Sequence, residues 1–339
     1  MTDQLGTTEL ATAELASPFR LEPAFVSRIW GTADLRPWYD FVATGDPIGE
    51  VWLTGDQCRV AGGPLEGKTL GEVFAAYSRE MMGDAAPKYA QGASPLLLKV
   101  IFAKEKLSVQ VHPDDRLAQK YGQPRGKTEC WYALAAESGA EVAAGLKPGV
   151  TLETVEAEVS AGTLEQSLEV LPVAAGDLVF VDAGTVHAIW PGSVLLETQQ
   201  NSDITYRLFD YGRPRELHVA KALEAIRLHT DAGKVAPEVL VDRTILVDSA
   251  YFLVEKMVVD GVRSGESMHG TSAGSSGLTY LFAAEGAGIV RPRQSGDFAP
   301  VALPKCGIVA VPASASDWEI EDAGGLALIR ITPRWPEAS

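Results

Sequence analysis

Basic residues are scarce in this chain relative to acidic ones. Its 339 residues include 29 Lys plus Arg against 45 Asp plus Glu, which gives a formal net charge of −16 at pH 7. A negative surplus of this size opposes nonspecific attachment to nucleic acid or to an anionic membrane. We therefore expect neither as a partner, and an anionic ligand would need a local basic pocket.

Cysteine is also scarce, and its three residues are widely separated. Cys58, Cys130 and Cys306 are odd in number and lack Cys-x-x-Cys spacing, which argues against a disulfide framework and a thiolate zinc site. No apolar run approaches the roughly 18 residues of a membrane span, and the N-terminus lacks a basic start followed by an apolar signal core. The cytoplasm is therefore the expected location.

The stretch before Pro113 combines packing with polar chemistry. Residues 107–112 read Leu-Ser-Val-Gln-Val-His and are predicted to be extended, so Gln110 and His112 project from one face. Glu129 precedes another apolar run, and His187 ends a predicted strand and turn. Zinc accepts imidazole nitrogen together with carboxylate and carbonyl oxygen. Gln110, His112, Glu129 and His187 would make such a site.

One charged residue interrupts an otherwise apolar predicted strand. Residues 96–102 read Leu-Leu-Leu-Lys-Val-Ile-Phe, with Lys99 at the centre. An ammonium group is strongly disfavoured in an apolar interior unless it is paired. Lys99 must therefore reach solvent or meet an anion, and a phosphate-bearing substrate could supply that anion.

Four segments resemble, in the same order, the type I phosphomannose isomerases, which are zinc-dependent members of the cupin superfamily. The segments are LLLKVIFAKEKLSVQVHPDD, GKTECWYAL, AGTVHAI and ETQQNSDITYRLFDYGR, and the resemblance runs from about Glu22 to Leu228. The segment that ends at His187 also fits the cupin metal-binding pattern, except that Asp182 stands where Pro is usual. Four motifs in the family's order are far more specific than any one of them.

The resemblance implies a mainly β fold with two cupin-type, jelly-roll β-barrels and added helices. We predict a flexible tail over residues 1–20 and a metal-binding catalytic domain over residues 21–240, with helical insertions and a connector helix over residues 216–228. Residues 241–339 would form a degenerate cupin-like domain. Its one histidine, His269, lies in a Gly/Ser-rich loop instead of at a metal-binding turn.

The resemblance also implies a role for each candidate site residue. The chain would bind one Zn²⁺, with a phosphorylated hexose as substrate. The implied residues are the metal ligands Gln110, His112, Glu129 and His187, the residues Lys99, Ser108 and Lys127 near the substrate phosphate, and the catalytic Arg207.

The implied reaction interconverts mannose 6-phosphate and fructose 6-phosphate through a cis-enediol. It needs a general base and fixed positive charge near the developing oxyanion, which Arg207 could supply. Glu197, Lys127 and a metal-bound water all stay open as the base.

Two other functions remain possible from the sequence. The chain could be a cupin that binds a sugar phosphate without turnover, as a regulator, or an iron-dependent cupin oxygenase. Iron oxygenases commonly use two His and one carboxylate, so Gln110 and the surrounding Lys and Arg weigh against the second alternative. The oligomeric state is open, and a monomer is compatible with the sequence.

Overall fold

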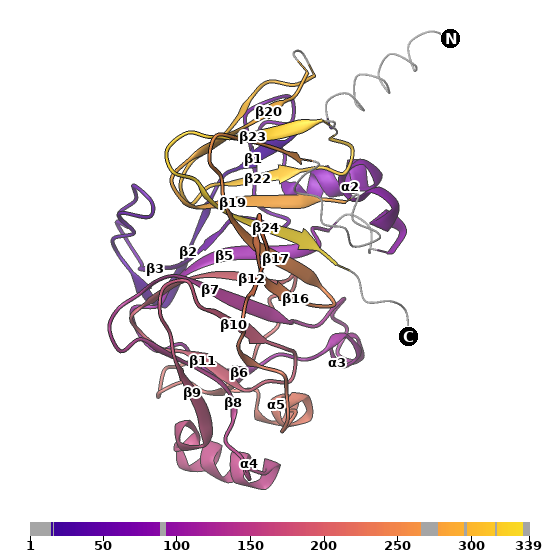
Figure 1. Cartoon of the computed structure of the whole chain (residues 1–339). Coiled ribbons are helices and arrows are strands. Elements are labelled where there is room, and N and C mark those ends of the chain that lie inside the picture. Colours follow the sequence, from indigo (N-terminus) through magenta and orange to yellow (C-terminus); the bar gives the residue numbers. More distant parts are fainter. Residues whose placement is uncertain are drawn as a thin grey trace. The chain divides into compact units, whose positions relative to one another are not determined.

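A computed structural model describes residues 15, 17–88, 93–265, 277–294, 297–315 and 317–334. In these residues antiparallel strands form four sheets, so the predicted mainly β fold class is confirmed (Figure 1). Residues 1–14 of the tail predicted over residues 1–20 lie outside the described residues, and so does His269. None of the described helices is long and apolar enough to cross a membrane.

The chain divides into two compact units. The central unit consists of residues 25–52 and 96–236, and the terminal unit consists of residues 1–24, 53–95 and 237–339. Residues 53–95, which the sequence prediction placed in the catalytic domain over residues 21–240, group with the C-terminal strands.

Strands of the central unit belong to two sheets. The seven-stranded sheet contains β2 (Ala24–Thr32), β3 (Ile48–Trp52), β5 (Leu96–Phe102), β7 (Glu129–Ala136), β10 (Leu178–Val181), β12 (Ser193–Gln200) and β14 (Gly233–Lys234). The five-stranded sheet contains β6 (Val109–Val111), β8 (Glu141–Leu146), β9 (Leu168–Pro172), β11 (His187–Ile189) and β13 (Tyr206–Phe209). Their orders are β14-β10-β7-β12-β5-β3-β2 and β13-β6-β11-β8-β9.

The apolar core of the central unit joins these two sheets. Ile101 and Trp131 come from the seven-stranded sheet, and Val142 and Ile189 come from the five-stranded sheet. Side chains two apart on a strand share a face, so Lys99 lies on the same face of β5 as Ile101. This alternation brings polar side chains to the face that also carries the core.

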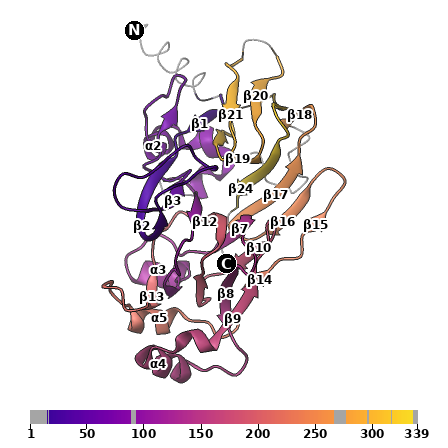
Figure 2. The ribbon, with the colours of Figure 1, turned by 90° about the vertical axis from the view of Figure 1, so that its left-hand side faces the viewer.

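Two helices cover the other face of the five-stranded sheet. These are α4 (Leu152–Ala161) and α5 (Val219–Ala225), and Figures 1 and 2 both show them beside that sheet. Val155 of α4 and Ala222 of α5 pack with Val109 and Val111 of β6. The helix is thus shorter than the connector helix predicted over residues 216–228, because the backbone becomes extended at Ile226. Helix α5 packs against β6. The remaining helical segments here are α3 (Asp115–Lys120) and the 3₁₀ helix η2 (Leu164–Ser167).

The terminal unit also contains two sheets around an apolar cluster. Its eight-stranded sheet contains β1 (Phe19–Leu21), β4 (Val60–Ala61), β15 (Glu238–Val239), β16 (Thr244–Asp248), β17 (Phe252–Val258), β19 (Thr279–Glu285), β22 (Ile308–Val311) and β24 (Ala327–Pro333). Its four-stranded sheet contains β18 (Val262–Ser264), β20 (Gly288–Pro292), β21 (Val301–Leu303) and β23 (Trp318–Asp322). The helical segments are α2 (Leu70–Met82) and η1 (Gly83–Lys88).

Early segments of the chain are built into the terminal unit by backbone pairing. Strand β1 pairs with β22 and with β4, so Phe19 and Arg20 belong to a sheet and not to a tail as predicted. Helix α2 begins with the capping box of Thr69 and Glu72. At its other end, the N–H of Ala313 donates to the carbonyl of Met81. These contacts explain why residues 53–95 group with the C-terminal strands.

Candidate active site and metal centre

The strand register collects the polar side chains of the central unit into two rows. On the seven-stranded sheet, Lys99 of β5 lies opposite Glu197 of β12. On the five-stranded sheet, Arg207 of β13 lies opposite Gln110 of β6, which lies opposite His187 of β11. Residues directly opposite on neighbouring strands project from the same face. Each row therefore presents its functional groups to one side of its sheet.

Three of the four predicted metal ligands form one buried cluster. Ligand atoms of His112, Glu129 and His187 all lie within 4.8 Å of one another. Each histidine Nε2 lies 3.5 Å from a different oxygen of Glu129. Within the described ranges, this is the only group of three or more His, Cys, Asp or Glu side chains placed to hold a metal ion.

Hydrogen bonds fix the outward nitrogen of both histidines. His112 Nδ1 lies 2.7 Å from the Ile204 carbonyl, and His187 Nδ1 lies 2.9 Å from the Thr185 carbonyl. A carbonyl oxygen can only accept, so each Nδ1 carries the proton and each Nε2 keeps a lone pair. Burial lowers the pKa of His112 well below its usual value and that of His187 to about 4, so both rings are neutral near pH 7. Neutral imidazoles beside a carboxylate fit a divalent ion such as zinc.

Gln110 lies beside this cluster and is held by Ser108. Its Nε2 lies 3.2 Å from His187 Nε2, and its Oε1 accepts a hydrogen bond of 3.1 Å from the Ser108 hydroxyl. Ligation through the Gln110 oxygen would need the amide to turn so that this oxygen faces the histidines. Ser108 therefore controls the orientation of a predicted ligand.

The turn before His187 is stabilised without the usual proline. The Asp182 carboxylate accepts a hydrogen bond of 2.8 Å from the Thr185 hydroxyl. Gly184 has a φ of 94°, a conformation that favours glycine, and its N–H donates to the His112 carbonyl. This turn consequently links the backbones that carry His112 and His187.

Two lysines meet carboxylates of the protein beside the cluster. Lys127 donates to Glu129, and its Nζ lies 3.1 Å from His112 Nε2 and 3.6 Å from Glu197 Oε1. Burial raises the pKa of Glu129 to about 7. Burial also disfavours the charge on Glu197, but Lys127 and Lys99 outweigh it and lower the pKa of Glu197 to about 2.

Lys99 forms ion pairs with two carboxylates of the protein. Its Nζ lies 2.8 Å from Glu197 Oε2 and 3.9 Å from Glu50 Oε2. Burial favours the neutral amine, but these two carboxylates raise the pKa of Lys99 above its usual value. Lys99 therefore meets an anion, as one of its two predicted options required, and strands β3 and β12 supply both carboxylates. A contact between Lys99 and a substrate phosphate stays a prediction.

A cavity of about 460 Å³ opens onto these groups. This volume is within the range of small-molecule binding sites. Its walls include the predicted site residues Lys99, Ser108, Gln110, Lys127, Glu129 and Arg207. All of its lining residues belong to the central unit.

Comparisons with known proteins agree on one family. Residues 18–158 match the model of the phosphomannose isomerase type I catalytic domain. The mannose-6-phosphate isomerase of Streptococcus mutans is 34% identical over 261 residues, which are 73% of this chain and 80% of that protein. The mannose-6-phosphate isomerase ManA of Bacillus subtilis is 35% identical over 264 residues, with 73% and 81% covered. The chain belongs to the type I phosphomannose isomerases.

A solved structure extends the similarity to nearly the whole chain. The crystal structure of the mannose 6-phosphate isomerase from Bacillus subtilis is 31% identical and has a TM-score of 0.79. The match covers 93% of this chain and 99% of that chain. The fold of this family member is thus shared with a mannose 6-phosphate isomerase in both units.

Sequence reasoning missed several residues of this phosphomannose isomerase cavity. Glu50 accepts hydrogen bonds from Arg28 and from the Trp52 indole, and Glu50, Arg28 and Arg215 all line the cavity. Arg28 and Glu50 are polar residues between apolar neighbours on β2 and β3, and this was the only local signal for them. The residues that they contact depend on strand pairing, which local sequence patterns do not predict.

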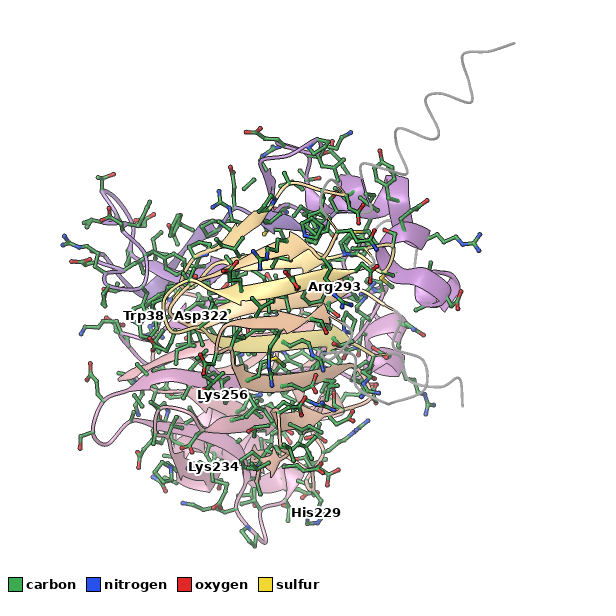
Figure 3. The ribbon with its side chains drawn as sticks, turned by 45° about the horizontal axis from the view of Figure 1, so that its top comes forward. Trp38, His229, Lys234, Lys256, Arg293 and Asp322 are labelled. Carbon is green, nitrogen blue, oxygen red and sulfur yellow. The ribbon has the colours of Figure 1, made fainter. Side chains whose placement is uncertain are left out.

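Two histidines outside the metal-binding cluster, His218 and His229, differ from each other. His218 Nδ1 accepts from the Arg207 N–H at 3.3 Å, so it helps to fix the backbone of the predicted catalytic arginine. His229 is exposed, and Figure 3 shows it at the edge of the ribbon.

Proposed function

We propose that this chain is a zinc-dependent isomerase that interconverts mannose 6-phosphate and fructose 6-phosphate through a cis-enediol. The observation that carries the proposal is the buried His112, Glu129 and His187 cluster at a cavity that is also lined by two lysines and three arginines. Family membership supplies the sugar phosphate, and the cluster supplies a place for the metal.

Gln110, His112, Glu129 and His187 would hold one zinc ion. A mannose 6-phosphate isomerase of the same fold, 17% identical with a TM-score of 0.72, was crystallised with zinc and yttrium. When bound, the ion would act as a Lewis acid toward the oxygens at C1 and C2 of the sugar. The two Nδ1 hydrogen bonds to Ile204 and Thr185 would keep both imidazoles in the ligating tautomer.

Glu197 and Lys127 are the side chains best placed to move the proton between C1 and C2. Both line the cavity, and they form an ion pair. A carboxylate with a pKa of about 2 is a poor proton acceptor while two ammonium groups hold it. Glu197 would therefore accept a proton only when substrate loosens that pairing, and Lys127 would be the adjacent proton donor.

Arg207 would stabilise negative charge on the enediol oxygen. It lines the cavity from β13, and its Nη1 donates to the Glu216 carbonyl at 2.8 Å, which holds the guanidinium in place. A fixed cation at a developing oxyanion lowers the barrier without reorganisation. Lys99, Ser108 and Lys127 would orient the remainder of the substrate from the same cavity.

The test couples metal content to turnover in one preparation. Metal per chain and conversion of mannose 6-phosphate to fructose 6-phosphate are measured before chelation, after chelation and after zinc is returned. We expect about one zinc per chain, with activity that is lost and recovered with it. Metal with bound sugar phosphate but no isomerisation would favour the regulator, and iron-dependent oxygen consumption would favour the oxygenase.

A further inference from the structure

The central unit contains a second cavity, of about 350 Å³, which is within the range of small-molecule sites. Its lining residues lie within four segments, 32–38, 102–104, 135–137 and 191–194. All of them belong to the central unit, and among the described residues none also lines the cavity at the metal cluster. A ligand in this second cavity would therefore contact none of the groups assigned to the reaction.

An apolar row of side chains forms part of the second cavity. Phe102 of β5 and Ala135 of β7 both lie opposite Val194 of β12, so all three project from the same face of the seven-stranded sheet. Their neighbours Ile101 and Leu195 belong to the apolar core between the two sheets of the unit. Because side chains alternate along a strand, the row lies on the face away from that core.

Trp38 adds an indole to the wall, from the loop that follows β2 (Figure 3). Its N–H donates to the Leu35 carbonyl at 3.0 Å, and the Leu35 N–H donates to the Phe41 carbonyl at 3.1 Å. Tyr39 of this loop packs edge-on against Phe102, with ring centroids 6.2 Å apart. The indole is therefore positioned by a folded loop before a ligand binds, which lowers the entropy cost of binding.

The charged side chains at the second cavity cancel in sum. They are Asp34, Arg36, Lys104 and Glu137. Arg36 donates twice to the Asp34 carboxylate, at 2.9 and 2.6 Å, whereas Lys104 and Glu137 make no ion pair among the described residues. All four are exposed, and exposed charges contribute little to an ionic interaction. The cavity thus offers hydrogen-bond donors and acceptors without selecting an anion or a cation.

A buried hydroxyl at the second cavity lacks a partner. Ser193 is among the lining residues and is 4% exposed, and its Oγ has no hydrogen-bond partner in the part of the chain that the structure describes. An unpaired buried hydroxyl is a net cost to the fold. A ligand hydroxyl would supply the partner after the side chain rotates about χ1.

We propose that the second cavity binds a neutral sugar in its closed pyranose form. A pyranose ring has a face of C–H groups that stacks on an indole and packs against apolar side chains such as Phe102 and Val194. Each sugar hydroxyl both donates and accepts, which matches a wall that carries carboxylates, cationic donors and the Ser193 hydroxyl. This site does not depend on the proposed isomerase function, because no group assigned to the reaction takes part in it.

Methyl α-mannoside is the probe, because a glycoside stays closed and cannot be isomerised. Its dissociation constant is measured by NMR titration of the full chain in wild type, Trp38→Ala and Val42→Ala. Val42 lies in the same loop and is 50% exposed but does not line the cavity, so Val42→Ala is the matched control. We expect Trp38→Ala to weaken binding by about tenfold or more. Val42→Ala should change it by less than about twofold.

Ser193→Ala separates binding from fold stability. Removing an unpaired hydroxyl should leave the free energy of unfolding unchanged or raise it, while glycoside binding weakens by about threefold or more. A merely structural role of Ser193 would instead lower stability and leave the affinity unchanged. If Trp38→Ala does not fold, Trp38→Leu keeps apolar volume but loses the ring face, and it should still weaken binding severalfold.

Competition distinguishes the second cavity from the cavity at the metal cluster. Glycoside binding should persist at saturating mannose 6-phosphate and change by less than about twofold between low and high salt, because the site selects no charge. Trp38→Ala should keep the wild-type rate of sugar phosphate isomerisation, so this inference and the proposed function fail separately.

Three results would overturn the inference. They are the absence of saturable binding of the glycoside to the wild-type chain, its displacement by mannose 6-phosphate, and wild-type affinity in a folded Trp38→Ala, or in Trp38→Leu where only that variant folds. Phenylalanine is the comparison ligand. Binding of phenylalanine in place of the glycoside, lost in Trp38→Ala, would assign the cavity to an amino acid and refute the sugar.

Discussion

At the scale of single residues, one imidazole decides whether the metal stays. His112→Ala should lose both zinc and turnover, because its Nε2 is one of the nitrogens that face Glu129. Removing a hydrogen-bond partner of a metal ligand already weakens metal binding by about 10–100-fold. Removing the ligand itself should therefore weaken zinc binding by more than about 100-fold. Zinc per chain and isomerase rate are the measurements. His229→Ala, an exposed histidine outside the cluster, is the matched control, and full turnover in His112→Ala would refute the site assignment.

Arg207 should separate catalysis from metal binding. Arg207→Ala removes the proposed oxyanion partner but none of the clustered ligands, so it should keep zinc and reduce kcat by about 10²–10³-fold. Steady-state kinetics on a preparation with measured zinc content test this. Loss of zinc together with activity would mean that Arg207 supports the metal ligands instead of the reaction.

The ionisation of Glu129 predicts how zinc affinity depends on pH. Burial raises the pKa of the metal-free carboxyl to about 7, above the 4.5 of an exposed Glu. Zinc needs the carboxylate, so binding must expel a proton below about pH 7 and need not do so above it. Zinc affinity should therefore fall by about tenfold per pH unit as the pH drops below 7. Calorimetry in buffers of different ionisation enthalpy measures the number of protons released when zinc binds. Zinc binding without proton release at pH 6 would contradict the prediction.

At the scale of elements, the backbone just after the α3 loop passes close to the backbone just before α3. A Cβ on Gly126 would lie 2.5 Å from the carbonyl oxygen of Pro113. Gly126→Ala must therefore shift the backbone beside Lys127 or His112, and it should destabilise the fold by about 1–3 kcal/mol and weaken zinc binding. Gly45→Ala is the control, because a Cβ there would meet nothing within 4 Å. Denaturant unfolding and zinc titration measure the two effects. Equal free energies of unfolding and equal zinc affinities in the two variants would contradict the prediction.

Alternation within a strand explains which site elements were predictable. The shared face of Gln110 and His112 follows from their spacing of two, and the turn before His187 follows from its glycine. The structure brings His112, Glu129 and His187 together as expected. Glu50 and Arg215 were missed because their partners are Lys99 and Asp210, which only strand register and loop anchoring bring near.

At the scale of the whole molecule, domain boundaries were the least predictable feature. The sequence motifs run through a continuous stretch, so residues 21–240 were expected to form one domain. Pairing of β1 with β22 and the contact between α2 and Ala313 connect distant segments, and no local pattern encodes such pairings. The division into two units in turn predicts which substitutions affect stability without affecting the metal.

A buried ion triad in the terminal unit provides that test. Arg330 Nε donates to Glu255 at 2.7 Å, and Arg243 Nε lies 2.9 Å from the other Glu255 oxygen. Arg330→Met leaves the buried Glu255 charge partly unpaired, and it should lower the free energy of unfolding by about 3–5 kcal/mol. Arg293→Met, which removes an exposed pair with Asp317 (Figure 3 labels Arg293), should lower it by less than about 1 kcal/mol. Below the unfolding transition both variants should keep wild-type zinc content, because the ligands belong to the central unit, and early loss of zinc in Arg330→Met would show that the metal centre depends on the terminal unit.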